Sequence, residues 1–74
     1  MTLGEKRVRV NFNVSNDSDV QKIKENSAKL IDEINNLQNK KLEGEELSEF
    51  NRLKSLAITH IENGCMWAVK AATI

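Results

Sequence analysis

The fold is decided by the stretch from Glu45 to Ala72, which reads EELSEFNRLKSLAITHIENGCMWAVKAA. Its apolar residues recur at steps of three and four, the period that places side chains on one face of an α-helix. We therefore predict one long helix over residues 45–72. Gly64 costs about 1 kcal/mol relative to alanine inside a helix, which indicates either a kink or a place where another backbone or a ligand comes close. The apolar series consists of Leu47, Phe50, Leu53, Ala57, Ile61, Gly64, Ala68 and Ala72, flanked by Leu56, Ile58, Cys65 and Val69.

A shorter helix is predicted ahead of it, over residues 18–39. The four residues Ser15 to Ser18 are all good helix N-caps, and Ser18 with Gln21 has the spacing of a capping box, so the helix should start near Asp19. Gly44 then supplies the conformational freedom that a chain reversal requires. One face of this helix carries Val20, Ile23, Ser27, Leu30, Ile31, Ile34 and Leu37.

The N-terminal segment has a different period. Residues 7–14 alternate polar and apolar side chains, and a period of two is typical of extended backbone. We predict an extended arm over residues 1–17, and thus a single all-α domain over residues 1–74, an antiparallel helical hairpin with a short extended N-terminal arm. The apolar positions of the arm are Val8, Val10, Phe12 and Val14, and the polar ones are Arg7, Arg9, Asn11 and Asn13.

Two antiparallel helices enclose no interior, because each apolar stripe covers only part of the other. The uncovered remainder would face water and would promote aggregation. We therefore predict a homo-oligomeric helical assembly, in which Met66, Trp67, Val69 and Ile74 pack against a neighbouring protomer.

Composition narrows the function. A chain of 74 residues buries a small core, which disfavours an independent enzyme and favours binding or assembly. Equal numbers of basic and acidic residues, 11 of each, argue against duplex nucleic acid, although a small phosphorylated ligand remains open. A single cysteine excludes an intramolecular disulfide and fits a reducing compartment. Without an apolar run of roughly 20 residues or a signal sequence, we expect a soluble protein that does not bind membranes.

No catalytic or metal-binding constellation is expected. His60 and Cys65 lie on different faces of the long helix, and a metal site needs three or four convergent ligands. Cys65 has no histidine at helical spacing to activate it as a nucleophile, so a small core residue is the simpler interpretation. We therefore predict no catalytic residue, no metal and no cofactor.

Cationic and aromatic side chains offer binding chemistry, each with a structural alternative. Arg7 and Arg9 either solvate the arm or contact phosphate, and Phe12 either joins the core or stacks on a nucleobase. Lys24, taken alone, is an ordinary surface lysine. Lys70 lies in a stretch otherwise free of charge, where its ammonium group either reaches out to water or binds an anion.

The segment from Ile61 to Ala72 ends in the string Met66-Trp67-Ala68-Val69-Lys70-Ala71. This string resembles the Met-Trp-Ala-x-(Lys/Arg)-Ala signature in the closing helix of the anti-CBASS cyclic-oligonucleotide sponges, a family of very small bacteriophage proteins. The order of elements is also similar over most of residues 8–74: an arm with an aromatic residue, a first helix opening with VQKIK at residues 20–24, a loop, and a long helix.

The resemblance implies a non-enzymatic protein in the cytoplasm of the infected bacterial host. Such a protein sequesters cyclic di- and trinucleotide messengers without cleaving them, so that host immune effectors stay inactive. The family is usually a homohexamer with ligand sites between protomers. It implies a dinucleotide site using Phe12 and Lys24, and a trinucleotide site using Lys70 with arm residues near Asn11. Arg9 would assist Lys24 at the phosphates, and Phe12, where the family commonly has tyrosine, keeps stacking but loses a hydroxyl hydrogen bond.

Two alternatives stay open at this point. The hairpin could be a protein–protein interaction module that docks Met66 and Trp67 into a partner protein. It could also be a sponge for signals of the cyclic ADP-ribose type, since phosphates and a stacked base call for the same residues.

Overall fold

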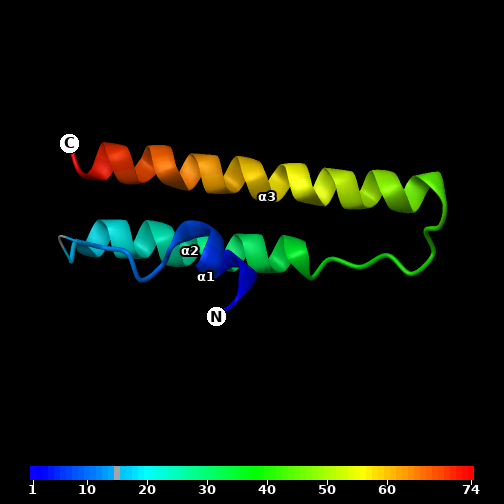
Figure 1. The fold of residues 1–74 in the computed structure, drawn as a ribbon, viewed down its shortest axis with the longest axis horizontal. Coiled ribbons are helices and arrows are strands. Elements are labelled where there is room, and N and C mark those ends of the chain that lie inside the picture. Colours follow the sequence, from blue (N-terminus) through cyan, green and yellow to red (C-terminus); the bar gives the residue numbers. More distant parts are fainter. Residues whose placement is uncertain (15) are drawn as a thin grey trace.

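The computed structural model describes residues 1–14 and 16–74, and over these residues the chain forms three α-helices and no strand. They are α1 (Leu3–Val8), α2 (Ser18–Asn35) and α3 (Glu45–Ala72). In Figure 1, α2 and α3 run antiparallel along the length of the molecule, joined by a loop at one end, and α1 lies over α2. The predicted all-α class is confirmed, and α3 occupies the range predicted for the long helix.

The extended N-terminal arm is wrong over α1. Thr2 and Glu5 form a capping box: the Thr2 hydroxyl accepts from the Glu5 N–H, and the Glu5 carboxylate accepts from the Thr2 N–H at 2.8 Å. This reciprocal pair satisfies two backbone donors that would otherwise lack partners, and so it starts a helix. Alternation of side chains was the misleading signal, because the capping-box spacing at Thr2 precedes it and determines the local backbone.

Glycine allows α1 to pack directly on α2. The Gly4 N–H donates to Asp32 Oδ1 at 2.7 Å, and a Cβ atom at Gly4 would lie only 2.0 Å from the carbonyl oxygen of Ala28. No other residue type fits there without moving one of the two helices. The position of α1, and of every side chain that it carries, therefore depends on this contact.

The start of α2 agrees with the predicted range, but its capping residue is not Ser18. Its N-cap is Asp17, whose carboxylate accepts from the N–H groups of Asp19 and Val20, so the helix begins at Ser18 itself. Asn13 holds the N-cap residue of α2 in place, because its side-chain oxygen accepts from the Asp17 N–H and its amide donates to the Asp17 carbonyl. The Ser15 cap candidate lies outside the described residues.

The end of α2 falls at Asn35, four residues before the predicted end at 39. Its last turn carries no basic residue of its own. Lys54 of α3 supplies the missing charge, because its ammonium group donates to the carbonyls of Asn35 and Leu37, each at 2.9 Å. A cation at a helix C-terminus satisfies the unpaired carbonyls and complements the helix dipole.

The core lies where the three helices meet. The buried residues of α3, Ile58 and Cys65, are ones that the sequence placed at the flank of the apolar series. Leu47 and Leu53 of the series itself are exposed, as is the flanking Leu56. Gly64 has open space where a Cβ would point, so the close approach expected there is not made within one protomer. Across the described ranges, no helix is long and apolar enough to cross a bilayer. The buried core is Val8, Val10, Ala28, Ile31, Ile58 and Cys65, packed against Leu3, Ile23, Ile34, Ile61 and Val69.

Candidate functional site

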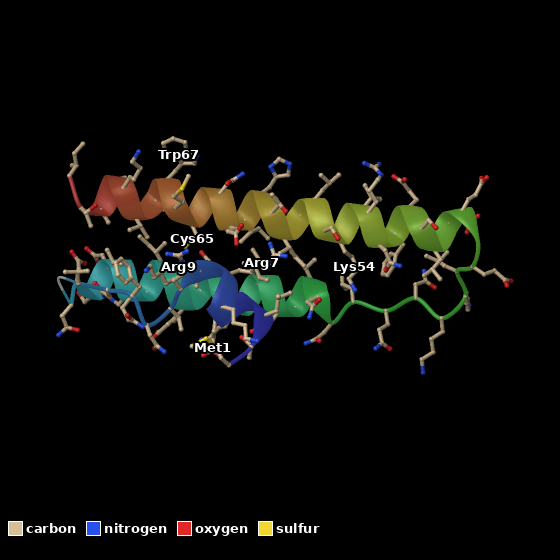
Figure 2. The ribbon with its side chains drawn as sticks, viewed as in Figure 1. Met1, Arg7, Arg9, Lys54, Cys65 and Trp67 are labelled. Atoms are coloured by element: carbon tan, nitrogen blue, oxygen red, sulfur yellow. The ribbon has the colours of Figure 1, made fainter. Side chains whose placement is uncertain are left out.

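A cationic groove of about 520 Å³ separates α1 from the C-terminal half of α3. Figure 2 shows Arg7 and Arg9 in the space between these elements, while Trp67 projects from the side of α3 turned away from α2. Four cationic side chains and one carboxylate line the groove, a balance that favours an anionic ligand. Its lining residues are Arg7, Val8, Arg9, Lys24, Glu62, Asn63, Cys65, Met66, Val69 and Lys70.

The C-terminal end of α1 positions two of these cations, Arg7 and Arg9, at the groove. The Arg9 N–H donates to the Lys6 carbonyl at 3.3 Å and the Val10 N–H to the Glu5 carbonyl at 3.1 Å, the hydrogen bonds of a Schellman motif. Such a motif needs a left-handed residue, normally glycine, and here Arg9 adopts it with φ 54°. A residue with a side chain costs about 1–2 kcal/mol in this conformation. Strained backbone conformations are frequent at functional sites, so Arg9 is a candidate functional residue.

Lys24 is held by the backbone that follows α1. Its side chain is only 6% exposed, and its ammonium group donates to the carbonyl of Arg9 at 3.1 Å and to the carbonyl of Phe12. It is therefore not the ordinary surface lysine that the sequence alone indicated. A buried ammonium is tolerated because oxygen acceptors replace its water. Two of its three N–H groups are engaged by these carbonyls, which leaves one for a ligand in the groove.

Lys70 connects the groove to an exposed aromatic surface. Its Nζ lies 4.8 Å from the centroid of the Trp67 ring, within the range of a cation–π interaction. Trp67 and Met66 are both largely exposed. Val69, predicted to pack on a neighbouring protomer, is partly buried against the core of its own chain and lines the groove.

Phe12 and Asn11 line a different depression, of about 430 Å³, on the other side of the turn that follows α1. Phe12 is 63% exposed, with its ring centroid 5.5 Å from Lys24 Nζ. Arg9 borders both depressions. The structure thus brings Arg9, Lys24 and Lys70 together and keeps Phe12 beside Lys24, whereas Asn11 lines the depression with Phe12 and Lys70 lines the groove.

Three polar residues of the groove were not included in the predicted site: Arg7, which the sequence offered only as an open alternative for phosphate contact, and Glu62 and Asn63. Arg7 belongs to the last turn of α1, and its Nη1 lies 3.8 Å from Glu62 Oε1 on α3. Asn63 precedes Lys70 by seven residues, two helical turns, so both lie on the same face of α3. That spacing was the available signal for α3, and the capping box at Thr2 was the signal that places Arg7 on a helix.

Cys65 and His60, the two residues considered for metal or nucleophilic chemistry, have different surroundings. Cys65 is buried and lines the groove, and His60 is exposed and does not line it. Within residues 1–14 and 16–74, no group of three or more His, Cys, Asp or Glu side chains could hold a metal ion. Binding of an anion is what the groove's charges support.

Comparison with known proteins gives one match. No curated protein and no solved structure matches the chain. The model of one protein family, described as the Acb2/Tad1 hairpin domain, matches residues 5–73, which confirms the resemblance carried by Met66 to Ala71. With the match spanning the groove and nearly the whole chain, from within α1 to the end of α3, the chain belongs to the Acb2/Tad1 hairpin domain family.

Proposed function

We propose that this protein captures cyclic oligonucleotide messengers, both cyclic dinucleotides and cyclic trinucleotides, and holds them without cleavage. The single observation that carries the proposal is the groove in which Arg7, Arg9, Lys24 and Lys70 converge from three helices and a turn. Cyclic oligonucleotides are small polyanions, with one negative phosphodiester per nucleotide. A groove of about 520 Å³ lies within the range of small-molecule pockets, about 300–1,000 Å³.

The aromatic side chains supply the second half of the recognition. Phe12 is exposed beside the buried Lys24, so a base can stack on its ring while a phosphate approaches the remaining N–H of the ammonium group. Base stacking tolerates any base, and the cations select the phosphates. We assign this pair to cyclic dinucleotides, with Arg9 as a further phosphate ligand.

Trinucleotide binding requires a neighbouring chain in this proposal. Asn11 and Lys70 line separate pockets in one protomer, and we propose that one ligand contacts both by bridging two protomers. A symmetric oligomer presents each residue repeatedly around an axis, which suits a ligand that is itself a ring of repeated units. The sites would then be built from residues of adjacent copies.

The surface of α3 supports the assembly. At about 100° per residue, the core-facing side chains of α3 and its exposed stripe lie roughly 150° apart around the helix axis. One helix thus carries two apolar faces, of which α1 and α2 cover one. We propose that the second face packs on other copies of the chain in a homo-oligomer, a hexamer as in the family. The exposed stripe consists of Leu53, Leu56, His60, Gly64, Trp67, Ala71 and Ile74.

Capture without cleavage is the part of the proposal that concerns the chemistry around the groove. Its described lining includes the buried Cys65 thiol and no histidine that could activate it. The test is to incubate cyclic triadenylate with a stoichiometric excess of protein, remove the free ligand by ultrafiltration, denature the complex and analyse the released nucleotide. We expect retention by the protein and release of the intact ring. Linear adenylates in the released fraction would show an enzyme and overturn the proposal.

A further inference from the structure

One carboxylate stands among the cations of the groove. Of the described residues that line it, Glu62 alone carries a negative charge. Its Oε1 lies 3.8 Å from Nη1 of Arg7, and the two residues belong to opposite walls, α3 and α1. The pair therefore spans the space in which an anionic ligand would lie.

The geometry of this pair makes it easy to exchange. A charge-assisted hydrogen bond between a guanidinium and a carboxylate has a donor–acceptor distance of about 2.7–2.9 Å, so 3.8 Å is a contact between charges without a hydrogen bond. Both side chains are partly exposed to water, where such pairs contribute little to stability. A phosphate offers Arg7 two parallel hydrogen bonds in place of this loose contact.

The other cations of the groove have different partners from Arg7. Lys24 directs its ammonium group to backbone carbonyls, and Lys70 lies over the Trp67 ring. Arg9 makes no side-chain hydrogen bond or ion pair with the described residues, so it and Arg7 are the two guanidinium groups that can grip phosphate in the groove. Of these two arginines, Arg7 is the one that lies beside a carboxylate, that of Glu62, which would compete with a phosphate for its guanidinium group.

We propose that Arg7 is a phosphate-binding residue and that Glu62 is its internal counter-ion, which a ligand must displace. Glu62 thereby determines selectivity. An anion that contacts Arg7 alone replaces the Glu62 carboxylate with another negative group and gains no further contact. A polyphosphate or a cyclic oligonucleotide engages Arg9 and Lys70 at the same time, and these added contacts allow it to displace Glu62. This inference rests on the proposed function for the natural ligand, but the exchange itself concerns any polyanion.

The test is a double-mutant cycle on Arg7 and Glu62, measured by calorimetric titration with sodium tripolyphosphate and with cyclic triadenylate. We expect Arg7→Gln to weaken binding about tenfold and Glu62→Gln to strengthen it about threefold to tenfold. In the Arg7→Gln background, Glu62→Gln should change the affinity less than twofold, because the competition no longer exists. The matched control is Glu49→Gln, which breaks the exposed ion pair with Arg52 elsewhere on α3 and should leave both affinities unchanged. Circular dichroism of each variant checks that the helices are retained.

The outcomes separate this inference from the proposed function. An equal gain from Glu62→Gln in both backgrounds would show that Glu62 is only a nearby negative charge, and an unchanged affinity in Arg7→Gln would remove Arg7 from the site. Either result overturns the inference while leaving cyclic oligonucleotide capture intact. Coupling with tripolyphosphate, together with no binding of any cyclic oligonucleotide, would instead overturn the proposed function and support the inference. No binding of either probe by the folded wild-type protein would overturn both.

Discussion

The buried ammonium group of Lys24 donates to the backbone carbonyl of Arg9, fifteen residues earlier in the chain, at 3.1 Å. This contact joins α2 to the turn that closes α1, and it holds the left-handed Arg9 in place. Lys54 makes the equivalent contact at the end of α2. Two lysines thus cap two helix ends from a neighbouring helix, and only Lys24 also lines the groove.

Replacing Lys24 should therefore affect stability as well as binding. Lys24→Met keeps the length of the side chain but leaves the carbonyls of Arg9 and Phe12 without a charged donor. We expect the free energy of unfolding to fall by about 2–3 kcal/mol, since hydrogen bonds from charged groups contribute about 1.5–3 kcal/mol and buried unpaired acceptors are costly. Urea denaturation measures this change.

Two control variants compare Lys24 with other lysines of the chain. Lys22→Met alters an exposed lysine on the same helix and should change stability by less than about 0.5 kcal/mol. Lys54→Met should lower stability but leave ligand affinity unchanged, because Lys54 lies away from the groove. Equal stability of Lys24→Met and Lys22→Met would contradict the capping role.

Arg9 should lower the stability of the fold through its strained backbone and raise the affinity for the ligand through its guanidinium group. Arg9→Gly relieves the strain of a side chain in the left-handed conformation, whereas Arg9→Ala keeps the strain and removes the same guanidinium group. We expect both variants to lose affinity for a cyclic oligonucleotide about tenfold or more, and Arg9→Gly to be more stable than Arg9→Ala by about 1 kcal/mol. Thermal unfolding and calorimetry measure the two quantities. If both variants bound as the wild type does, Arg9 would be only a residue of the turn.

Gly4 should be required for the site although it touches no ligand. Gly4→Ala places a Cβ against the Ala28 carbonyl at a separation that no packed structure tolerates, so α1 must move away from α2. We expect a loss of about 1–3 kcal/mol in stability and weaker binding, because Arg7 and Arg9 move with α1. Gly64→Ala is the control: it has open space within the protomer and should not lower the stability of a single chain. Unchanged binding and stability in Gly4→Ala would show that α1 is not held by this contact.

Self-association through the second face of α3 can be tested with a matched pair of leucines. Leu53 and Leu37 are each 52% exposed, but only Leu53 belongs to the exposed stripe of α3. Leu53→Glu should reduce the mass in solution to that of one 8.4 kDa chain, because burial of an unpaired carboxylate in an interface is unfavourable. Leu37→Glu should leave the mass unchanged. Light scattering gives both masses, and equal behaviour of the two variants would exclude this face as the interface.

Much of the helical hairpin follows from the sequence. A period of three and four residues over residues 45–72 predicts α3, since that spacing places Ile58, Ile61, Cys65 and Val69 on one face. The same period cannot say which of two apolar faces meets the rest of the chain. Leu53 and Trp67 fit the helical period as well as Ile58 does, yet in the folded protomer Ile58 is buried while Leu53 and Trp67 are exposed.

The N-terminal segment shows why local patterns fail. Val8 and Val10 are both buried, as an extended arm with alternating side chains would have them. They are buried because a helix ends at Val8 and a left-handed Arg9 turns the chain. Periodicity cannot distinguish these two backbones over so few residues, whereas the capping-box spacing of Thr2 and Glu5 could.

The groove was predictable in its residue types and not in its geometry. Lys70 was identified by its apolar surroundings, Arg9 as an open alternative for phosphate contact, and Lys24 only through the family resemblance; the structure brings the three together. Neither the burial of Lys24 under two carbonyls nor the ion pair of Arg7 with Glu62 follows from sequence spacing, because each joins elements far apart in the chain.

Calorimetric titration with cyclic triadenylate tests the central claim most directly, using the wild-type protein beside the Lys70→Gln and Arg9→Ala variants at two salt concentrations. We expect saturable binding by the wild type, weaker binding at the higher salt concentration, and a loss of about tenfold or more in each variant. The ratio of ligand to chain then shows how many protomers build a site. Absence of heat from the folded wild-type protein, or an affinity that neither variant changes, would contradict the claim that this groove captures cyclic oligonucleotides.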